Sequence, residues 1–176
     1  MPKLPIGDIG AVEVVYDYGT ESGQANLVIS PYLGAVKERI NDAYADVQEE
    51  DYGDASVDAV FKGTTVEVEI PMARSTLLQL AGVLPGVELS GSVLTFSNKC
   101  GSSMYDSAVP LLFKPKRDGV VSTNHAEWIL VYKAFAYRAI ELSFDRSTQR
   151  THLVKFKVFP MQESGYEGKY FQEGVA

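Results

Sequence analysis

Short segments that alternate between apolar and polar residues dominate the chain. Residues 64–70, 139–144 and 153–159 each carry an apolar side chain at every second position. Period-two alternation places all the apolar side chains on one face of a β-strand. The polar stretch 145–150 is short enough to join the last two segments as an antiparallel hairpin. Pro71 removes a backbone donor, so we expect the first strand to end there.

Two segments carry helical spacing instead. Residues 75–84 predict one short helix, which Ser75 or Thr76 can cap and which Pro85 ends. Residues 35–48 are ambiguous, because their alternation is poor and their apolar residues recur at helical intervals. Periodicity alone favours a helix there, on a stripe made of Val36, Ile40, Ala43, Tyr44 and Val47.

Composition fits one globular domain over residues 1–176. The hydrophobic fraction is 45% and the charged fraction 22%, which is enough apolar material for a core. We expect the two end segments, 1–10 and 165–176, to be weakly structured arms. Residues 1–10 lack the apolar stretch of a secretory signal, and no apolar run approaches the ~18 residues of a membrane span.

Candidate chemistry is sparse. The chain has one cysteine, Cys100, two histidines and none of the common nucleophile, phosphate-loop or zinc motifs. We therefore expect no catalytic residues, no metal site and no cofactor, and we expect that the protein is not an enzyme. The net charge of −7 argues against binding to a phosphate backbone as the main activity, since such binding uses clustered Lys and Arg.

An acidic, Gly-containing stretch covers residues 49–63 and predicts a long loop. Calcium takes carboxylate oxygens, but the spacing here is not that of an EF-hand. A solvated loop and a contact loop between subunits are the other interpretations. The acidic residues of this stretch are Glu49, Glu50, Asp51, Asp54 and Asp58.

Two parts of the chain resemble the tail tube (major tail) proteins of long-tailed bacteriophages. Residues 51–63 are similar to the family's loop of the type D-x-Y-G-D-x-x-V-D-x-V-x-x-G, which a strand and a short helix follow. Residues 139–160 resemble the family's closing hairpin, and residues 168–171 its tail. The resemblance is strongest over 34–86 and 138–171, and it implies that residues 36–48 form a strand. We adopt the strand over the helix for that segment.

The resemblance implies a mainly β fold. It would be an antiparallel β-sandwich or barrel of two packed sheets, with one short flanking α-helix and the long acidic loop. It also implies a structural virion protein in the phage tail, assembled in the host cytoplasm. Its subunits would form hexameric rings that stack into a hollow tube for DNA ejection. The implied partners are other copies of the chain, a tape-measure protein and tail-end proteins. Genomic DNA would pass through the lumen without specific binding.

Two sets of residues follow as candidates within that picture. Apolar residues in an exposed loop indicate ordering on assembly, so we expect the loop to contact a neighbouring subunit or ring. Carboxylates facing the lumen offer no phosphate contacts, so DNA can slide. The contact residues are Glu49, Glu50, Asp51, Tyr52, Asp54, Val57, Asp58, Val60 and Phe61, and the lumen candidates are Glu38, Asp42, Glu67 and Glu69. The alternative function is a monomeric calcium- or carbohydrate-binding β-sandwich module.

Overall fold

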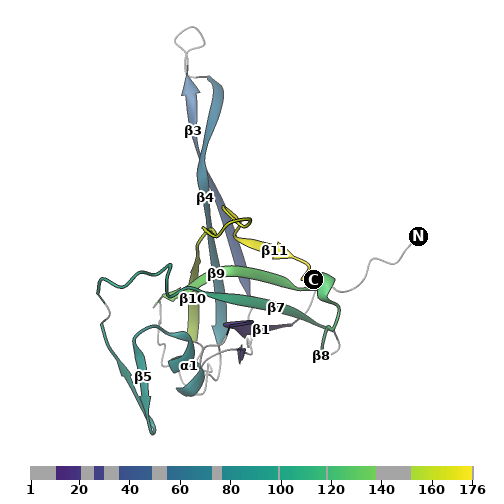
Figure 1. Ribbon diagram of the computed structural model, residues 1–176. Coiled ribbons are helices and arrows are strands. Elements are labelled where there is room, and N and C mark those ends of the chain that lie inside the picture. Colours follow the sequence, from purple (N-terminus) through teal and green to yellow (C-terminus); the bar gives the residue numbers. More distant parts are fainter. Residues whose placement is uncertain are drawn as a thin grey trace, which may run out of the picture.

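A long antiparallel sheet forms the body of the protein, and one of its hairpins extends well beyond that body (Figure 1). The computed structural model describes residues 11–20, 26–29, 36–48, 55–72, 77–98, 100–117, 119–137 and 152–175. The elements are β1 (Val12–Tyr16), β2 (Leu27–Ile29), β3 (Lys37–Gln48), β4 (Ser56–Met72), α1 (Leu77–Val83), β5 (Val87–Ser90), β6 (Val93–Phe96), β7 (Val109–Arg117), β8 (Val120–Val121), the 3-10 helix η2 (His125–Glu127), β9 (Ile129–Tyr137), β10 (His152–Val158) and β11 (Phe171–Glu173).

The main sheet runs in the order β2-β1-β7-β9-β10-β4-β3, and every neighbouring pair in it is antiparallel. β9 lies at its centre, with β7 on one edge and both β10 and β11 on the other. β5 and β6 form a separate hairpin. The described strands form no closed barrel, since β2 and β3 remain at the two ends of the order.

The core forms where the sheet folds over on itself. Tyr16 of β1 and Phe156 of β10 lie with ring centroids 6.4 Å apart, although β7 and β9 separate their strands in the sheet. Leu80 and Val83 of α1 complete the same apolar cluster. The prediction of a mainly β, antiparallel fold with one short helix is confirmed, and the arrangement is consistent with a β-sandwich.

Residues 35–48 show why helical spacing was misleading. Residues 37–48 form β3, as the resemblance implied, and pair with β4 along their whole length. Nearly all of β3 is exposed on both faces. Without one-sided burial there is no pressure for strict alternation, so scattered apolar residues imitated a helical stripe.

Three predicted boundaries change. Most of the expected loop 49–63 is strand, because β4 begins at Ser56. β4 also continues through Pro71, which pairs with Leu153 and lies beyond the last β3 partner, Lys37 opposite Glu69. β3 therefore needs no hydrogen bond from Pro71. The predicted strand 153–159 is β10, whereas 139–144, the turn 145–150 and the capping residues Ser75 and Thr76 lie outside the described residues.

The C-terminal segment is not the expected weakly structured arm. Phe171–Glu173 form β11 against β9, and Gly174 and Val175 donate backbone hydrogen bonds to Trp128 and His125. The Tyr170 hydroxyl also donates to the Thr64 carbonyl, at 2.7 Å. These bonds hold the segment to its own subunit. The other expected arm, residues 1–10, lies outside the described residues.

Burial in the core predicts which substitutions lower the free energy of unfolding most. Phe156 is fully buried, so Phe156→Ala is expected to lower the free energy of unfolding by about 3–5 kcal/mol, through lost burial and the cavity left behind. Phe96→Ala removes the same atoms from a half-exposed position and is expected to cost under about 1.5 kcal/mol. Urea unfolding followed by circular dichroism measures both. Equal losses would contradict this placement of the core.

Candidate functional site

The hairpin of β3 and the first half of β4 projects from the body as a two-stranded ribbon (Figure 1). We call residues 40–48 and 56–65 the ribbon. Almost every ribbon residue is exposed, whereas β4 becomes buried from Val66 onwards. A two-stranded hairpin is marginally stable in water without a third strand or a covering element. The ribbon is therefore an element that the described body supports little.

Apolar side chains on the ribbon are uncovered. Tyr44 and Phe61 are 65% and 63% exposed and lie directly opposite one another. The large exposed apolar residues of the ribbon are Ile40, Tyr44, Val47, Val57, Val60 and Phe61. Such a cluster on a projecting element is typical of a surface that another molecule covers.

A β-bulge decides which side chains meet on the ribbon. The register shifts between Ala43 and Tyr44, so that Ala43 pairs with Gly63 while Tyr44 pairs with Phe61. Lys62 is the extra residue, and Gly63 has a φ of +143°, a conformation that glycine adopts without the penalty a side chain brings. The bulge places the two aromatic rings on the face that also carries Ile40. The cross-strand partner of Ile40 is the buried Val66.

The predicted contact residues divide between described and undescribed parts. Val57, Asp58, Val60 and Phe61 lie on the ribbon strand of β4 and are exposed. They belong to regular strand rather than to a loop. Glu49, Glu50, Asp51, Tyr52 and Asp54 lie outside the described residues.

The four lumen candidates lie on opposite faces of the sheet. In the register, Glu38 and Asp42 share a face with Val68 and Thr64, while Glu67 and Glu69 share the other face with Arg39 and Lys37. One surface therefore cannot present all four carboxylates. Which of the two pairs would face a lumen stays a prediction.

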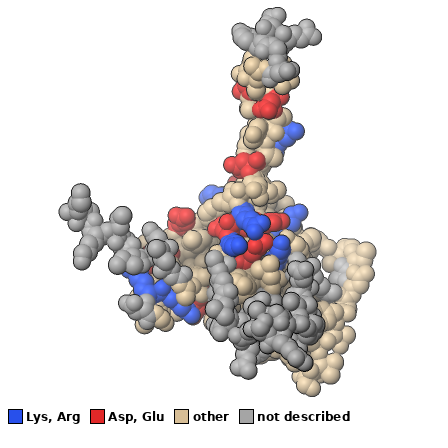
Figure 2. Space-filling view, turned by 180° about the vertical axis from the view of Figure 1, so that it is seen from behind, with Lys and Arg blue, Asp and Glu red and all other residues tan. Residues whose placement is uncertain are grey.

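Cations surround Glu69. It is buried and lies 3.1 Å from Lys155 Nζ and 3.2 Å from an Arg39 nitrogen. The hydrogen bond from Lys155, with Arg39 nearby, lowers the pKa of Glu69. Figure 2 shows this mixed cluster of acidic and basic side chains where the ribbon joins the body. Glu69 is thus a paired structural carboxylate, unsuited to an open acidic wall.

The remaining candidates differ in their surroundings. Glu38 lies at an exposed position of β3, where partial desolvation, and to a lesser degree Glu173, raises its pKa. Glu67 accepts a long hydrogen bond from the Tyr137 hydroxyl, at 3.4 Å. Asp42 is exposed on the ribbon and accepts from the Thr64 hydroxyl at 2.6 Å. Asp42 alone of the four keeps an exposed carboxylate on the projecting element.

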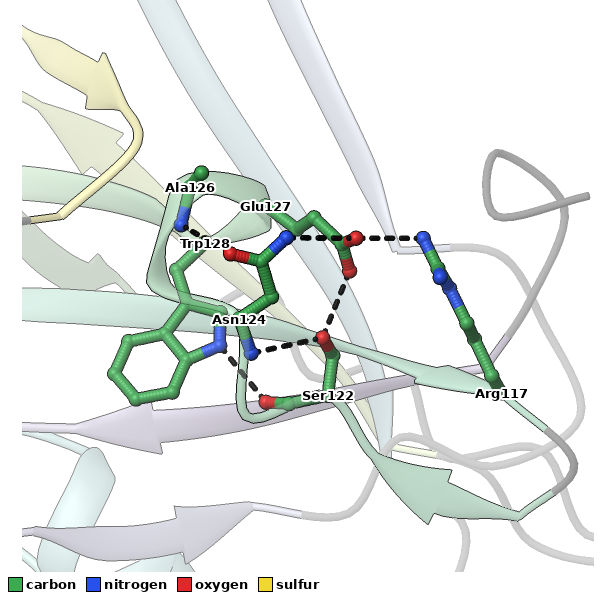
Figure 3. A network of polar contacts seen from close by, with 6 residues as sticks. All are labelled: Arg117, Ser122, Asn124, Ala126, Glu127 and Trp128. Atoms are coloured by element: carbon green, nitrogen blue, oxygen red, sulfur yellow. Dashed lines mark hydrogen bonds and ion pairs between the residues drawn. The ribbon is translucent and has the colours of Figure 1, made fainter. Parts of the chain in front are cut away.

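A second polar network has a structural explanation (Figure 3). Glu127 accepts from Arg117 and Ser122 at 2.7 Å each and from Asn124 at 3.1 Å. The hydrogen bonds from Ser122 and Asn124 are the main causes of its lowered pKa. Trp128 Nε1 donates to the Ser122 carbonyl. The network fixes the turn to which the C-terminal residues are bonded.

Groups that suit metal binding are not gathered in the described part of the chain. No three His, Cys, Asp or Glu residues there lie close enough to hold a metal ion. Cys100 is a free, exposed cysteine, and the His125 ring stacks on Trp128 with centroids 4.1 Å apart. Among the described helices, none is both long and apolar enough to cross a membrane.

The ion pairs of Glu69 predict a pH-dependent stability. A lowered pKa means stabilisation that is present above the usual carboxyl pKa of about 4.3 and is lost as the pH falls through the folded-state value. Glu69→Gln is expected to lower the urea midpoint at pH 7 and to approach the wild-type midpoint near pH 3. Glu163→Gln, on an exposed loop, is expected to stay near wild type at both. A Glu69→Gln deficit that is constant with pH would contradict the ion-pair account.

Comparison with known proteins leaves the family undetermined. No protein-family model matches the chain, and no curated protein matches it significantly.

Proposed function

We propose that this chain is a structural assembly subunit of the tail tube kind. Its copies would join into rings, six to a ring by the resemblance, and the rings would stack into a hollow tube that conducts DNA during ejection. Its place would be the virion tail, after assembly in the host cytoplasm. Assembly of this kind needs a head-to-tail interface, which closes sideways into a ring and stays open along the axis.

The observation that carries the proposal is the uncovered ribbon. Six large apolar side chains on it are each 39–65% exposed, on a hairpin whose outer half pairs with no third strand among those described. A second copy covering these side chains would recover about 25 cal/mol for each Å² of apolar surface removed from water.

The ends of the sheet support the same conclusion. β2 and β3 lie at the two ends of the described strand order, each with one edge free of any described strand. Free edges invite pairing with another chain, and closure into a ring satisfies them without limitless growth. The lumen that this proposal requires would depend on carboxylates other than the paired Glu69.

The proposal predicts concentration-dependent assembly that the ribbon controls. Wild-type protein is expected to form rings or tubes as its concentration rises, as seen by sedimentation velocity and negative-stain electron microscopy. Replacing residues 44–62 by Asn-Gly, a favoured two-residue hairpin turn, is expected to leave a folded monomer that does not assemble. Val120→Ser removes an equally exposed apolar side chain far from the ribbon and serves as the control.

Two outcomes would oppose this function. A wild-type chain that stays at 19.3 kDa at all concentrations contradicts it. So does a ribbon-deleted variant that forms normal tubes. A large rise in melting temperature on adding calcium to such a monomer would favour the alternative, a calcium-binding module.

A further inference from the structure

Two lysines and two aromatic rings lie together beside the middle of β9 and the end of β10. Lys133 Nζ lies 5.4 Å from the centroid of the Tyr105 ring, and Lys157 Nζ lies 5.7 Å from that of Phe159. The two rings meet edge to face with centroids 6.1 Å apart. We call these four residues the lysine–aromatic platform. Cations over aromatic faces and T-shaped ring pairs are each favourable, so the arrangement is a formed surface.

Backbone contacts hold the platform in place. The Phe159 amide donates to the Lys133 carbonyl at 2.8 Å, which ties the two strands together where β10 ends. The Gln162 amide donates to the Tyr105 hydroxyl at 3.0 Å and fixes the ring that comes from the loop before β7. Lys157 is exposed, whereas Lys133 and the two rings are half-buried. Neither platform lysine forms a salt bridge with a described carboxylate, and Glu67 is the residue opposite Lys157 in the pairing of β10 with β4. The platform therefore presents two positive charges beside two rings.

One face of the ribbon has the complementary chemistry. Tyr44 and Phe61 lie opposite one another, and Asp42 and Asp46 precede and follow Tyr44 at every second position. Residues two apart on a strand share a face, so two carboxylates flank two rings there. The carboxylates are four residues apart, which is about 13 Å along a strand. Figure 2 shows acidic side chains along the ribbon.

We propose that the ribbon of one copy docks on the lysine–aromatic platform of a second copy. The Asp42 and Asp46 carboxylates would pair with the Lys133 and Lys157 ammonium groups. Tyr44 and Phe61 would pack against Tyr105 and Phe159. The occupant is another copy because the ribbon points away from its own body (Figure 1). This inference rests on the proposed function, and it names the surface that receives the ribbon.

Charge favours the platform over an exposed apolar surface on α1 and β2. Val28, Leu77 and Leu78 form an uncovered patch where α1 meets β2. That patch supplies apolar area but no cation among these residues. Burying Asp42 and Asp46 against it would leave two carboxylates without partners, which is unfavourable. The platform would cover the ribbon's two rings and also pair its two carboxylates with lysines.

A charge exchange tests the proposed contact. Asp46→Lys and Lys157→Glu, made singly, are each expected to raise the critical concentration for assembly at least tenfold, because each places like charges together. The double variant restores an opposite pair and is expected to assemble within about threefold of wild type. Glu88→Lys makes the same charge change on β5, at an exposed position away from the ribbon, and serves as the matched control. Urea midpoints check that each variant is folded.

Each result decides between the two proposals. Wild-type assembly with no rescue in the double variant overturns the docking contact and leaves the assembly function standing. A wild type that never assembles overturns the assembly function first, and the contact with it. If Lys157→Glu weakens duplex DNA binding in low salt and leaves assembly unchanged, the platform serves a polyanion and the docking contact is wrong.

Discussion

An unsupported two-stranded ribbon is the constraint on which the rest of the account depends. β3 and the outer half of β4 satisfy each other's backbone hydrogen bonds along one edge only, and their side chains are exposed on both faces. In water such a hairpin gains little from burial to offset the entropy of ordering it. The protein nevertheless places Tyr44 and Phe61 there. A second molecule covering the ribbon would resolve the imbalance, and this is the physical basis of the proposal that the chain is an assembling subunit.

The body supplies the anchor for that ribbon. β4 is one continuous strand, exposed in its outer half and buried from Val66 to Met72, so the projecting part is a direct extension of the core. Lys155 and Arg39 bind Glu69 across the base of the ribbon and link β10, β4 and β3. Tyr170 adds a bond from the C-terminal segment to Thr64. These bonds hold the base of the ribbon to the sheet, which a contact between subunits through the ribbon would require.

Sequence patterns predicted the parts of the fold in which one face is buried. The alternation around Val66–Ile70 and Val154–Val158 gave strands because those residues form the core. Periodicity alone did not predict the β3 strand of the ribbon. Exposure on both faces removes the alternation of apolar and polar residues from which strands are recognised. The pairing register of β3 with β4 places Glu38 and Asp42 on one face and Glu67 and Glu69 on the other. The sequence of a single strand does not reveal that register. The lysine–aromatic platform unites Tyr105 with residues 28 to 54 positions later, a proximity that only the folded chain creates.

Hydrogen exchange of the ribbon amides as a function of protein concentration tests the central claim most directly. In the dilute monomer, the amides of 40–48 and 56–65 should exchange much faster than those of the core strands β7 and β10. As assemblies form, ribbon protection should rise to the level of the core, while core protection changes little. A ribbon that exchanges equally fast in monomer and assembly would show that no partner covers it, and would contradict the account.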